Sequence, residues 1–193
     1  MSIKKGSGGF YNSGGKYKTR IKGVKTHSYA VWRGMIRRCY KEEMQDKHPT
    51  YIGCSVCDEW HDFQVFAEWV DNQKYGSCGY QLDKDILVSG NRVYSPEACC
   101  FIPSELNTLL IDSGASRGDY PQGVSLRKDV NKFQAGLRMG GKLRHIGYFK
   151  CPQEAHQAYI SAKERYVKNR ALSWANKIDW DVFVSFMNWQ LKS

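Results

Sequence analysis

The sequence predicts an α+β fold in two parts, on the strength of three patterns. Apolar residues recur at helical spacing in the first half of the chain, strict two-residue alternation runs through residues 132–139, and a stretch rich in Gly, Ser and Pro separates the two regions. We therefore expect a basic flexible arm over residues 1–26, a module of helices and a hairpin over 27–112, a linker over 113–121, and a sheet-and-helix domain with a C-terminal helix over 122–193.

Composition indicates a folded protein with an anionic partner. Hydrophobic residues make up 41% of the 193 positions, enough for a real core. The formal net charge is +10, from 29 Lys and Arg against 19 Asp and Glu, which suits DNA or RNA. No apolar run approaches the roughly 20 residues that span a bilayer, and no secretion signal is evident. Seven cysteines without framework spacing indicate reduced thiols in a cytosol-like compartment.

The arm and the first two helices come next. Residues 1–26 hold seven Lys or Arg and no acid, so they form either a plain flexible terminus or an arm that wraps phosphates. Helical spacing predicts one helix over residues 29–40 and a second from about 58 to 72. On the first helix, the face opposite the apolar stripe carries cations that are either solvated or phosphate-facing, namely Arg33, Arg37 and Arg38.

Cys54 and Cys57 form a C-x-x-C pair between these helices. Two thiolates at this spacing supply half of a tetrahedral zinc site, but two more ligands are needed. Cys78 or His61 are the candidates for them, and no second pair has this spacing. We favour buried free thiols over zinc here.

Residues 81–107, QLDKDILVSGNRVYSPEACCFIPSELN, predict a hairpin followed by a helix. The first strand ends near Lys84, a Ser-Gly-Asn turn follows at 89–91, and a second strand runs over 94–101. A short helix then begins at a Ser104 cap after Pro103.

The sequence of the second domain predicts three antiparallel strands backed by one helix. A tight turn at Gly140-Gly141 joins two alternating strands, a third strand precedes them, and the helix starts near Pro152 and runs to roughly Asn169. The helix covers the apolar face, which leaves the polar face open. We expect that open face to display Arg127, Lys132, Gln134, Arg138 and Arg144. Residues 122–171 hold eleven Lys or Arg against three acids, and such a sheet can enter a DNA major groove.

This second domain resembles the AP2 DNA-binding domain. The resemblance is carried by the turn Gly140-Gly141-Lys142, the strand Ile146-Gly147-Tyr148-Phe149 and the helix start Glu154-Ala155. It implies sequence-selective binding of double-stranded DNA through the sheet. The residues implied in DNA contact are Arg127, Lys132, Gln134, Arg138, Lys142 and Arg144.

Residues 81–107 resemble the HNH endonucleases of bacteriophages, particularly those that carry an AP2 domain. The resemblance implies that Asp83 and Asn107 hold Mg²⁺ or a similar ion, while Lys84 stands where the family has its catalytic His and Ala98 where it has an Asn. An ordinary lysine is about 0.04% neutral at pH 7, so Lys84 is a poor general base, although its ammonium can hold a phosphate oxygen. His61 or His48 would have to replace the base from elsewhere in the chain.

Two functions stay open at this point. The first is an HNH-type DNA endonuclease, of the nicking or homing kind, that cleaves phosphodiesters with a divalent metal. The second is a catalytically inactive, nuclease-derived DNA-binding regulator or inhibitor of a host factor. A role in binding RNA or a protein is a weaker third. The expected partner is duplex DNA, with a host protein or a second copy as further partners, no membrane, and the cytoplasm of an infected bacterial cell as the location.

Overall fold

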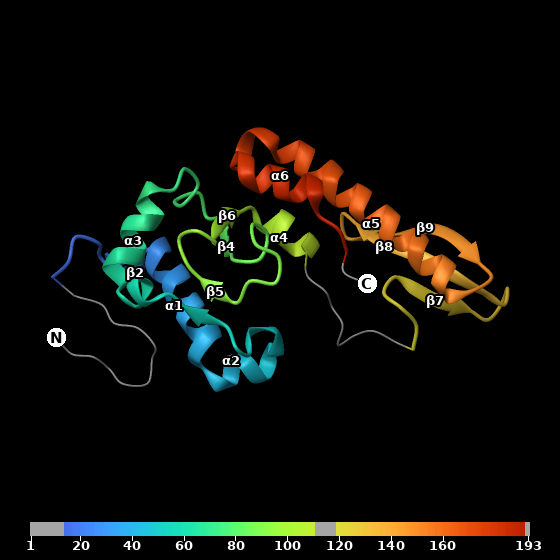
Figure 1. The fold of residues 1–193 in the computed structure, drawn as a ribbon, viewed down its shortest axis with the longest axis horizontal. Coiled ribbons are helices and arrows are strands. Elements are labelled where there is room, and N and C mark those ends of the chain that lie inside the picture. The colour runs from blue at the N-terminus through green and yellow to red at the C-terminus, as the bar shows by residue number, and fades with distance from the viewer. Residues whose placement is uncertain (1–13, 111–118, 192–193) are drawn as a thin grey trace. The chain divides into compact units, whose positions relative to one another are not determined.

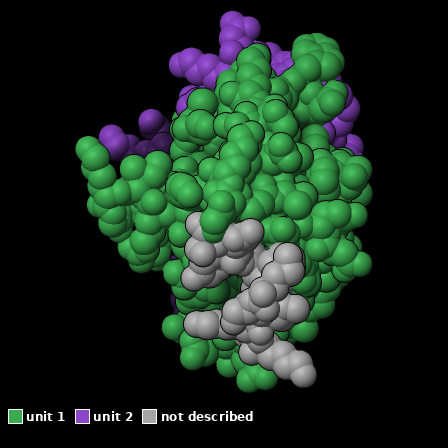
Figure 2. All heavy atoms as spheres, turned by 90° about the vertical axis from the view of Figure 1, so that its left-hand side faces the viewer, with its two compact units in different colours: residues 1–107, 178–182 green, residues 108–177, 183–193 purple. Residues whose placement is uncertain are grey.

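The structure is a computed structural model that describes residues 14–110 and 119–191. The chain divides into two compact units, coloured separately in Figure 2: residues 1–107 with 178–182, and residues 108–177 with 183–193. Both helices and sheets are present (Figure 1), so the predicted α+β class is confirmed. Most of the predicted linker lies outside the described residues.

The first unit contains several short strands and helices. In chain order these are β1 (Arg20–Ile21), β2 (Val24–Lys25), α1 (His27–Tyr40), α2 (Glu42–Lys47), a 3-10 turn (Pro49–Tyr51), β3 (Ser55–Val56), a second 3-10 turn (Asp58–His61), α3 (Phe63–Asn72), β4 (Gln81–Asp83), β5 (Val93–Tyr94), β6 (Cys100–Ile102) and the start of α4 (Ser104–Leu110).

The first two strands form a hairpin inside the segment expected to be a flexible arm. Lys22 and Gly23 both have positive φ, 48° and 80°, which is the geometry of a type I′ turn. Upstream, the backbone of Tyr17 exchanges hydrogen bonds of 2.8 and 2.9 Å with the side-chain amide of Gln64 on α3. Residues 14–26 are thus attached to the first unit, while the rest of the predicted arm, 1–13, lies outside the described residues.

Aromatic side chains form the core of this unit. Trp60, Phe63 and Phe66 are almost fully buried, with the Trp60 and Phe66 rings edge to face at 5.0 Å. The Trp32 indole on α1 donates to the Trp60 carbonyl at 2.7 Å, which satisfies a buried N–H. The single helix predicted from residue 58 is wrong, because Asp62 has extended backbone and accepts the Gln64 N–H, so that α3 begins only at Phe63.

The predicted second strand over residues 94–101 is also wrong. β4 pairs antiparallel with β6, in the register Asp83↔Cys100, whereas β5 pairs in parallel with β3, in the register Val56↔Tyr94. Between β5 and β6 the chain turns, and the N–H of Cys99 donates to Ser95 O at 3.0 Å. Proline cannot donate to a ladder and favours turns, so Pro96 explains the break.

The second unit is a three-stranded antiparallel sheet backed by a long helix. Its elements are β7 (Val124–Arg127), β8 (Lys132–Met139), β9 (Lys142–Phe149) and α5 (Pro152–Trp174), followed by a 3-10 turn (Ala175–Lys177). Leu137 of β8 is buried with Tyr159 and Ala162 of α5, as the predicted apolar face requires. Tyr166 of the same helix accepts the Gly140 N–H at 3.2 Å and so holds the β8–β9 turn.

The last helix, α6 (Trp180–Asn188), crosses the division between the units. Its buried positions are Val182 and Phe186, one helical turn apart, while Trp180 is 72% exposed.

Candidate functional site

Asp83, the predicted metal ligand, ends β4 and shapes the turn that follows it. Its Oδ1 accepts the backbone N–H groups of Asp85 and Ile86 at 2.9 and 2.8 Å. Burial raises the pKa of this carboxyl, and the two N–H donors only partly offset that effect. Oδ1 is thus occupied by the turn, and no hydrogen bond to Oδ2 exists among the described residues.

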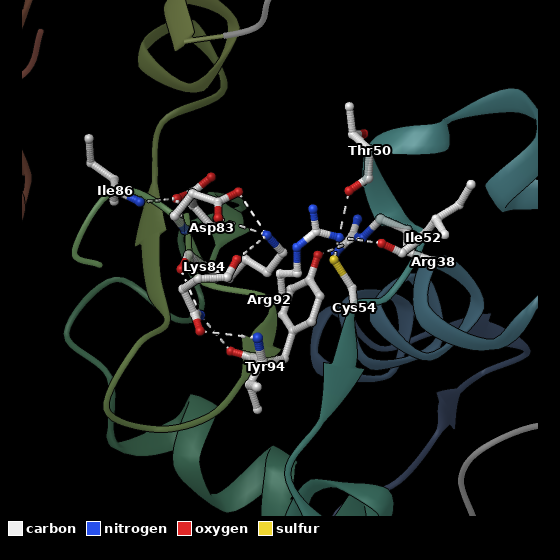
Figure 3. Close-up of polar contacts among 12 residues, drawn as sticks. Arg38, Thr50, Ile52, Cys54, Asp83, Lys84, Ile86, Arg92 and Tyr94 are labelled. Atoms are coloured by element: carbon white, nitrogen blue, oxygen red, sulfur yellow. Dashed lines mark hydrogen bonds and ion pairs between the residues drawn. The ribbon is translucent and has the colours of Figure 1, made fainter. Parts of the chain in front are cut away.

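Lys84, which the sequence resemblance compares with the catalytic His of HNH endonucleases, is 6% exposed and fully engaged (Figure 3). Its Nζ lies 2.8 Å from both carboxylate oxygens of Asp85 and donates to Asn91 O at 2.7 Å. An ammonium has three N–H donors, so these contacts use its whole capacity. In this structure Lys84 closes the 84–91 loop, and neither a general base nor a phosphate-binding role is open to it without breaking those contacts.

Asn91 is a second loop-closing residue, and sequence reasoning missed it. Its Nδ2 donates to Lys84 O at 3.0 Å and to Val93 O at 2.6 Å, and its Oδ1 accepts the Val93 N–H at 3.1 Å. The Ser-Gly-Asn turn composition was the available signal, because Asn side chains bond to nearby backbone. Ala98, which we compared with the family Asn, is buried and has no polar side chain.

Asn107, the second predicted metal ligand, lies on α4 and bonds to β4. Its Nδ2 donates to Gln81 Oε1 at 2.7 Å. Gln81 and Asp83 share one face of the strand, two residues or about 7 Å apart. Asp83 and Asn107 thus offer at most two protein oxygens, and no group of three His, Cys, Asp or Glu side chains comes together within residues 14–110 and 119–191. A Mg²⁺ ion held there would keep most of its waters.

The histidines considered as a replacement base have other partners. His61 Nε2 lies 3.1 Å from Tyr40 Oη, with which it shares a hydrogen bond, and the same oxygen accepts the Val56 N–H at 3.0 Å. His48 is exposed, with its ring 6.2 Å from that of Tyr51. Among the described residues, neither His61 nor His48 makes a hydrogen bond or ring contact with the Asp83 turn.

The C-x-x-C pair does not form a recognisable zinc site. Cys54 is buried and its thiol donates to Thr50 O at 3.8 Å, while Cys57 is half-buried and burial raises its pKa. Zinc binds thiolates, which a raised pKa disfavours. Neither thiol takes part in a disulfide among the described residues.

The open face of the second unit's sheet carries most of the predicted DNA-binding residues. The register pairs Arg127 with Lys132, and Gln134 with Ser125 and Tyr148, all on the face opposite the buried Ala135 and Leu137. Arg138 also points to this face, two residues further along. The structure therefore gathers Arg127, Lys132, Gln134 and Arg138 on one surface.

Two of the predicted contact residues lie on the other face. The two-residue turn at Gly140-Gly141 places Arg144 opposite the buried Leu137, and Lys142 opposite Met139. Their side chains leave the sheet on the side that α5 covers, near its edge, where both are exposed. The expectation that Arg144 lies on the open face is wrong because, in this register, residues 142 and 144 share the face of Met139 and Leu137.

Two residues not predicted to contact DNA, Leu143 and Tyr148, lie on the open face instead. Leu143 and Tyr148 are 62% and 45% exposed, and the Tyr148 ring lies 4.5 Å from that of His145. Leu143 lies over Gly136, where an added Cβ would meet its Cδ1 at 3.3 Å. The open face is thus a mixed surface, in which Leu143 stands opposite Arg138 and Tyr148 opposite Gln134.

The arginines of this face differ in how far they are already bonded. Arg127 donates to both carboxylate oxygens of Asp129 at 3.0 Å and to Gln134 Oε1 at 3.2 Å. Arg138 donates from Nη1 to Gly141 O at 2.9 Å, which leaves its other guanidinium donors for a ligand. Arg138 is therefore the arginine of this face best prepared for a bidentate contact.

No protein family, curated protein or solved structure that was compared with the chain matches it. In the part of the chain that the structure describes, no helix has the length and apolarity needed to cross a membrane. The functional conclusion therefore depends on the chemistry of these surfaces.

Proposed function

We propose that this protein binds double-stranded DNA through the open face of its β7–β9 sheet. The observation that carries the proposal is the gathering of Arg127, Lys132, Gln134 and Arg138 on an exposed antiparallel sheet whose other face packs against α5. A β-ribbon fits the major groove, where arginine pairs with guanine and glutamine with adenine. This is also the function that the AP2 resemblance implies.

Each part of the face has a chemical role in such a complex. Arg138 would bond guanine O6 and N7, and the exposed Lys132 would neutralise a backbone phosphate. Leu143 and Tyr148 offer apolar surface of the kind that contacts a thymine methyl group. The net charge of +10 would speed association with the polyanion.

The opposite placement of two arginines provides a matched test. Anisotropy titrations of the full chain with labelled duplexes should show that Arg138→Ala weakens binding to a selected preferred sequence about 5- to 150-fold, the range for one bidentate base contact. Arg144→Ala removes the same charge from the other face of the sheet and should cost much less. Equal losses from both variants would reduce the interaction to non-specific charge and overturn the assignment.

Metal-dependent phosphodiester cleavage is a second candidate. It is favoured by the position of Asp83 on β4, the strand whose Gln81 bonds Asn107 of α4, and it is opposed by the engagement of Lys84. We therefore place cleavage behind binding, as in a nuclease-derived regulator acting on DNA in the cytoplasm of an infected bacterium. Nicking of supercoiled plasmid by the wild type with Mg²⁺ or Mn²⁺, lost in Asp83→Ala, would reverse that order.

A further inference from the structure

A small pocket lies in the first unit, where α1 ends and the following turn passes it. Its volume is about 270 Å³. It is lined by Gly34, Arg37, Arg38, Met44, His48 and Tyr51. We infer that this pocket binds a phosphate group, and the inference is independent of DNA binding by the sheet.

The lining carries an unpaired positive charge at Arg37 and an imidazole at His48. Arg37 and His48 are exposed, and within the described residues neither side chain takes part in a hydrogen bond or an ion pair. None of the described residues that line the pocket carries a carboxylate. A cation without an internal partner retains its full capacity for an anionic ligand.

Arg38 is held in position before any ligand arrives. Its Nε donates to Tyr94 Oη at 3.2 Å, and its guanidinium carbon lies 5.5 Å from the ring centroids of both Tyr51 and Tyr94. Figure 3 shows Arg38 beside Tyr94. Stacking between two rings fixes the planar group and lowers the entropy lost on binding.

Gly34 indicates where the free end of Arg38 lies. An added Cβ at Gly34 would meet Arg38 Nη1 at 3.8 Å, so this nitrogen faces the pocket wall that the glycine leaves open. Glycine inside a helix costs about 1 kcal/mol relative to alanine, and here it leaves space for a ligand beside the guanidinium. A guanidinium fork with a free edge matches two oxygens of a phosphate.

The remaining wall suits the organic part of a phosphate ester. Met44 and Tyr51 supply apolar surface next to the cations. This combination fits a nucleotide phosphate, either in a free nucleoside monophosphate or within a nucleic-acid strand.

Amide chemical shifts of the ¹⁵N-labelled full chain provide the test. Titration with inorganic phosphate, against sodium chloride at equal ionic strength, should move the amide signals of Gly34, Met44 and His48. Adenosine monophosphate and a short oligothymidylate then identify the source. Tighter binding of the oligonucleotide identifies a strand phosphate, and tighter binding of the mononucleotide identifies a free phosphomonoester.

Matched variants separate this pocket from general surface charge. Arg37→Gln removes a lining charge and should weaken phosphate binding about tenfold or more. Gly34→Leu fills the pocket without changing charge and should do the same, whereas Arg33→Gln, an exposed arginine of the same helix outside the lining, should change little. An equal loss in Arg33→Gln, an unchanged affinity in Gly34→Leu, or shifts spread evenly over all basic segments would each overturn the inference. Arg138→Ala in the sheet should leave the phosphate response intact, which separates this result from that for duplex binding.

Discussion

Replacing Lys84 with methionine tests whether this lysine is structural. Methionine keeps the apolar stem but removes the ammonium that contacts the Asp85 carboxylate and Asn91 O. The Lys84 side chain is 8% exposed and that of Asp85 is 53% exposed, so water would solvate the carboxylate once it is released. The loss of stability is therefore below the ~3–5 kcal/mol of a fully buried pair. The partly buried Asn91 carbonyl would lose its donor, which costs about 1–3 kcal/mol.

We expect Lys84→Met to lower the stability of the first unit by about 2 kcal/mol. For a unit of this size that corresponds to a fall in Tm of roughly 6 to 10 °C, measurable by circular dichroism or urea unfolding. Lys47→Met, at an exposed lysine of the same unit, should stay within about 0.5 kcal/mol of the wild type. An unchanged Tm in Lys84→Met combined with weaker DNA binding would refute the structural role, because it would mean that the ammonium is free to meet phosphate.

Three further predictions follow from single residues. Asp83→Asn should raise the urea midpoint at pH 7, because burial raises the pKa of this carboxyl and its charged form destabilises the folded state. The gain in stability should vanish as pH falls toward about 4, and a lower midpoint at pH 7 would contradict the prediction. Iodoacetamide at pH 8 should label the exposed Cys78 first, and Cys99, whose pKa burial raises to about 12, only after unfolding. Mass spectrometry measures the labelling with and without EDTA. A change in labelling on chelation would indicate bound zinc. Gly123→Ala should destabilise the second unit by about 3 kcal/mol or more, because φ is 78° and a methyl group would overlap the Tyr159 ring. We expect a two-step thermal transition in which only the Tm of the second unit falls.

The helices and the long strands were predictable because their signals are local. α1 covers residues 27–40 where spacing predicted 29–40, and β8 buries Ala135 and Leu137 as its alternation predicted. Local spacing could not show the break at Asp62, since aromatic residues continue at helical steps on both sides of it. The cap residue itself was the only local signal.

Pairing between distant segments was harder to predict. β3 and β5 are two-residue strands whose parallel pairing joins residues nearly forty positions apart, and so short a strand has no readable period. The bulge after Ala135 is similar, because it decides that Gly147 and Tyr148 stand opposite Ala135 and Gln134. The faces of Arg144 and Leu143, by contrast, follow from the two-residue turn at Gly140-Gly141, which pairs Arg144 with Leu137 and Leu143 with Arg138.

At the Asp83 turn, residue chemistry alone predicted some properties and not others. The ordinary pKa of lysine was enough to predict that Lys84 is a poor base. Its partners were not predictable, because the contact with Asn91 O exists only once the loop closes. The same closure explains the importance of Asn91, whose side chain bonds to both ends of the loop.

Tyr94 connects the Asp83 turn with the phosphate pocket. Its ring centroid lies 5.9 Å from Lys84 Nζ and 5.5 Å from the Arg38 guanidinium carbon, so one aromatic ring contacts a cation from each region. Burial raises the pKa of the Tyr94 hydroxyl, which therefore stays neutral and accepts the Arg38 Nε–H. The hydrogen bonds of Lys84 all go to Asp85 and Asn91 of its own loop. Arg38 instead is held by Tyr94, and its Nη1 lies beside Gly34 in the pocket. Among the described residues of the first unit, we therefore expect phosphate to meet Arg37 and Arg38, and Tyr94 holds Arg38 in position.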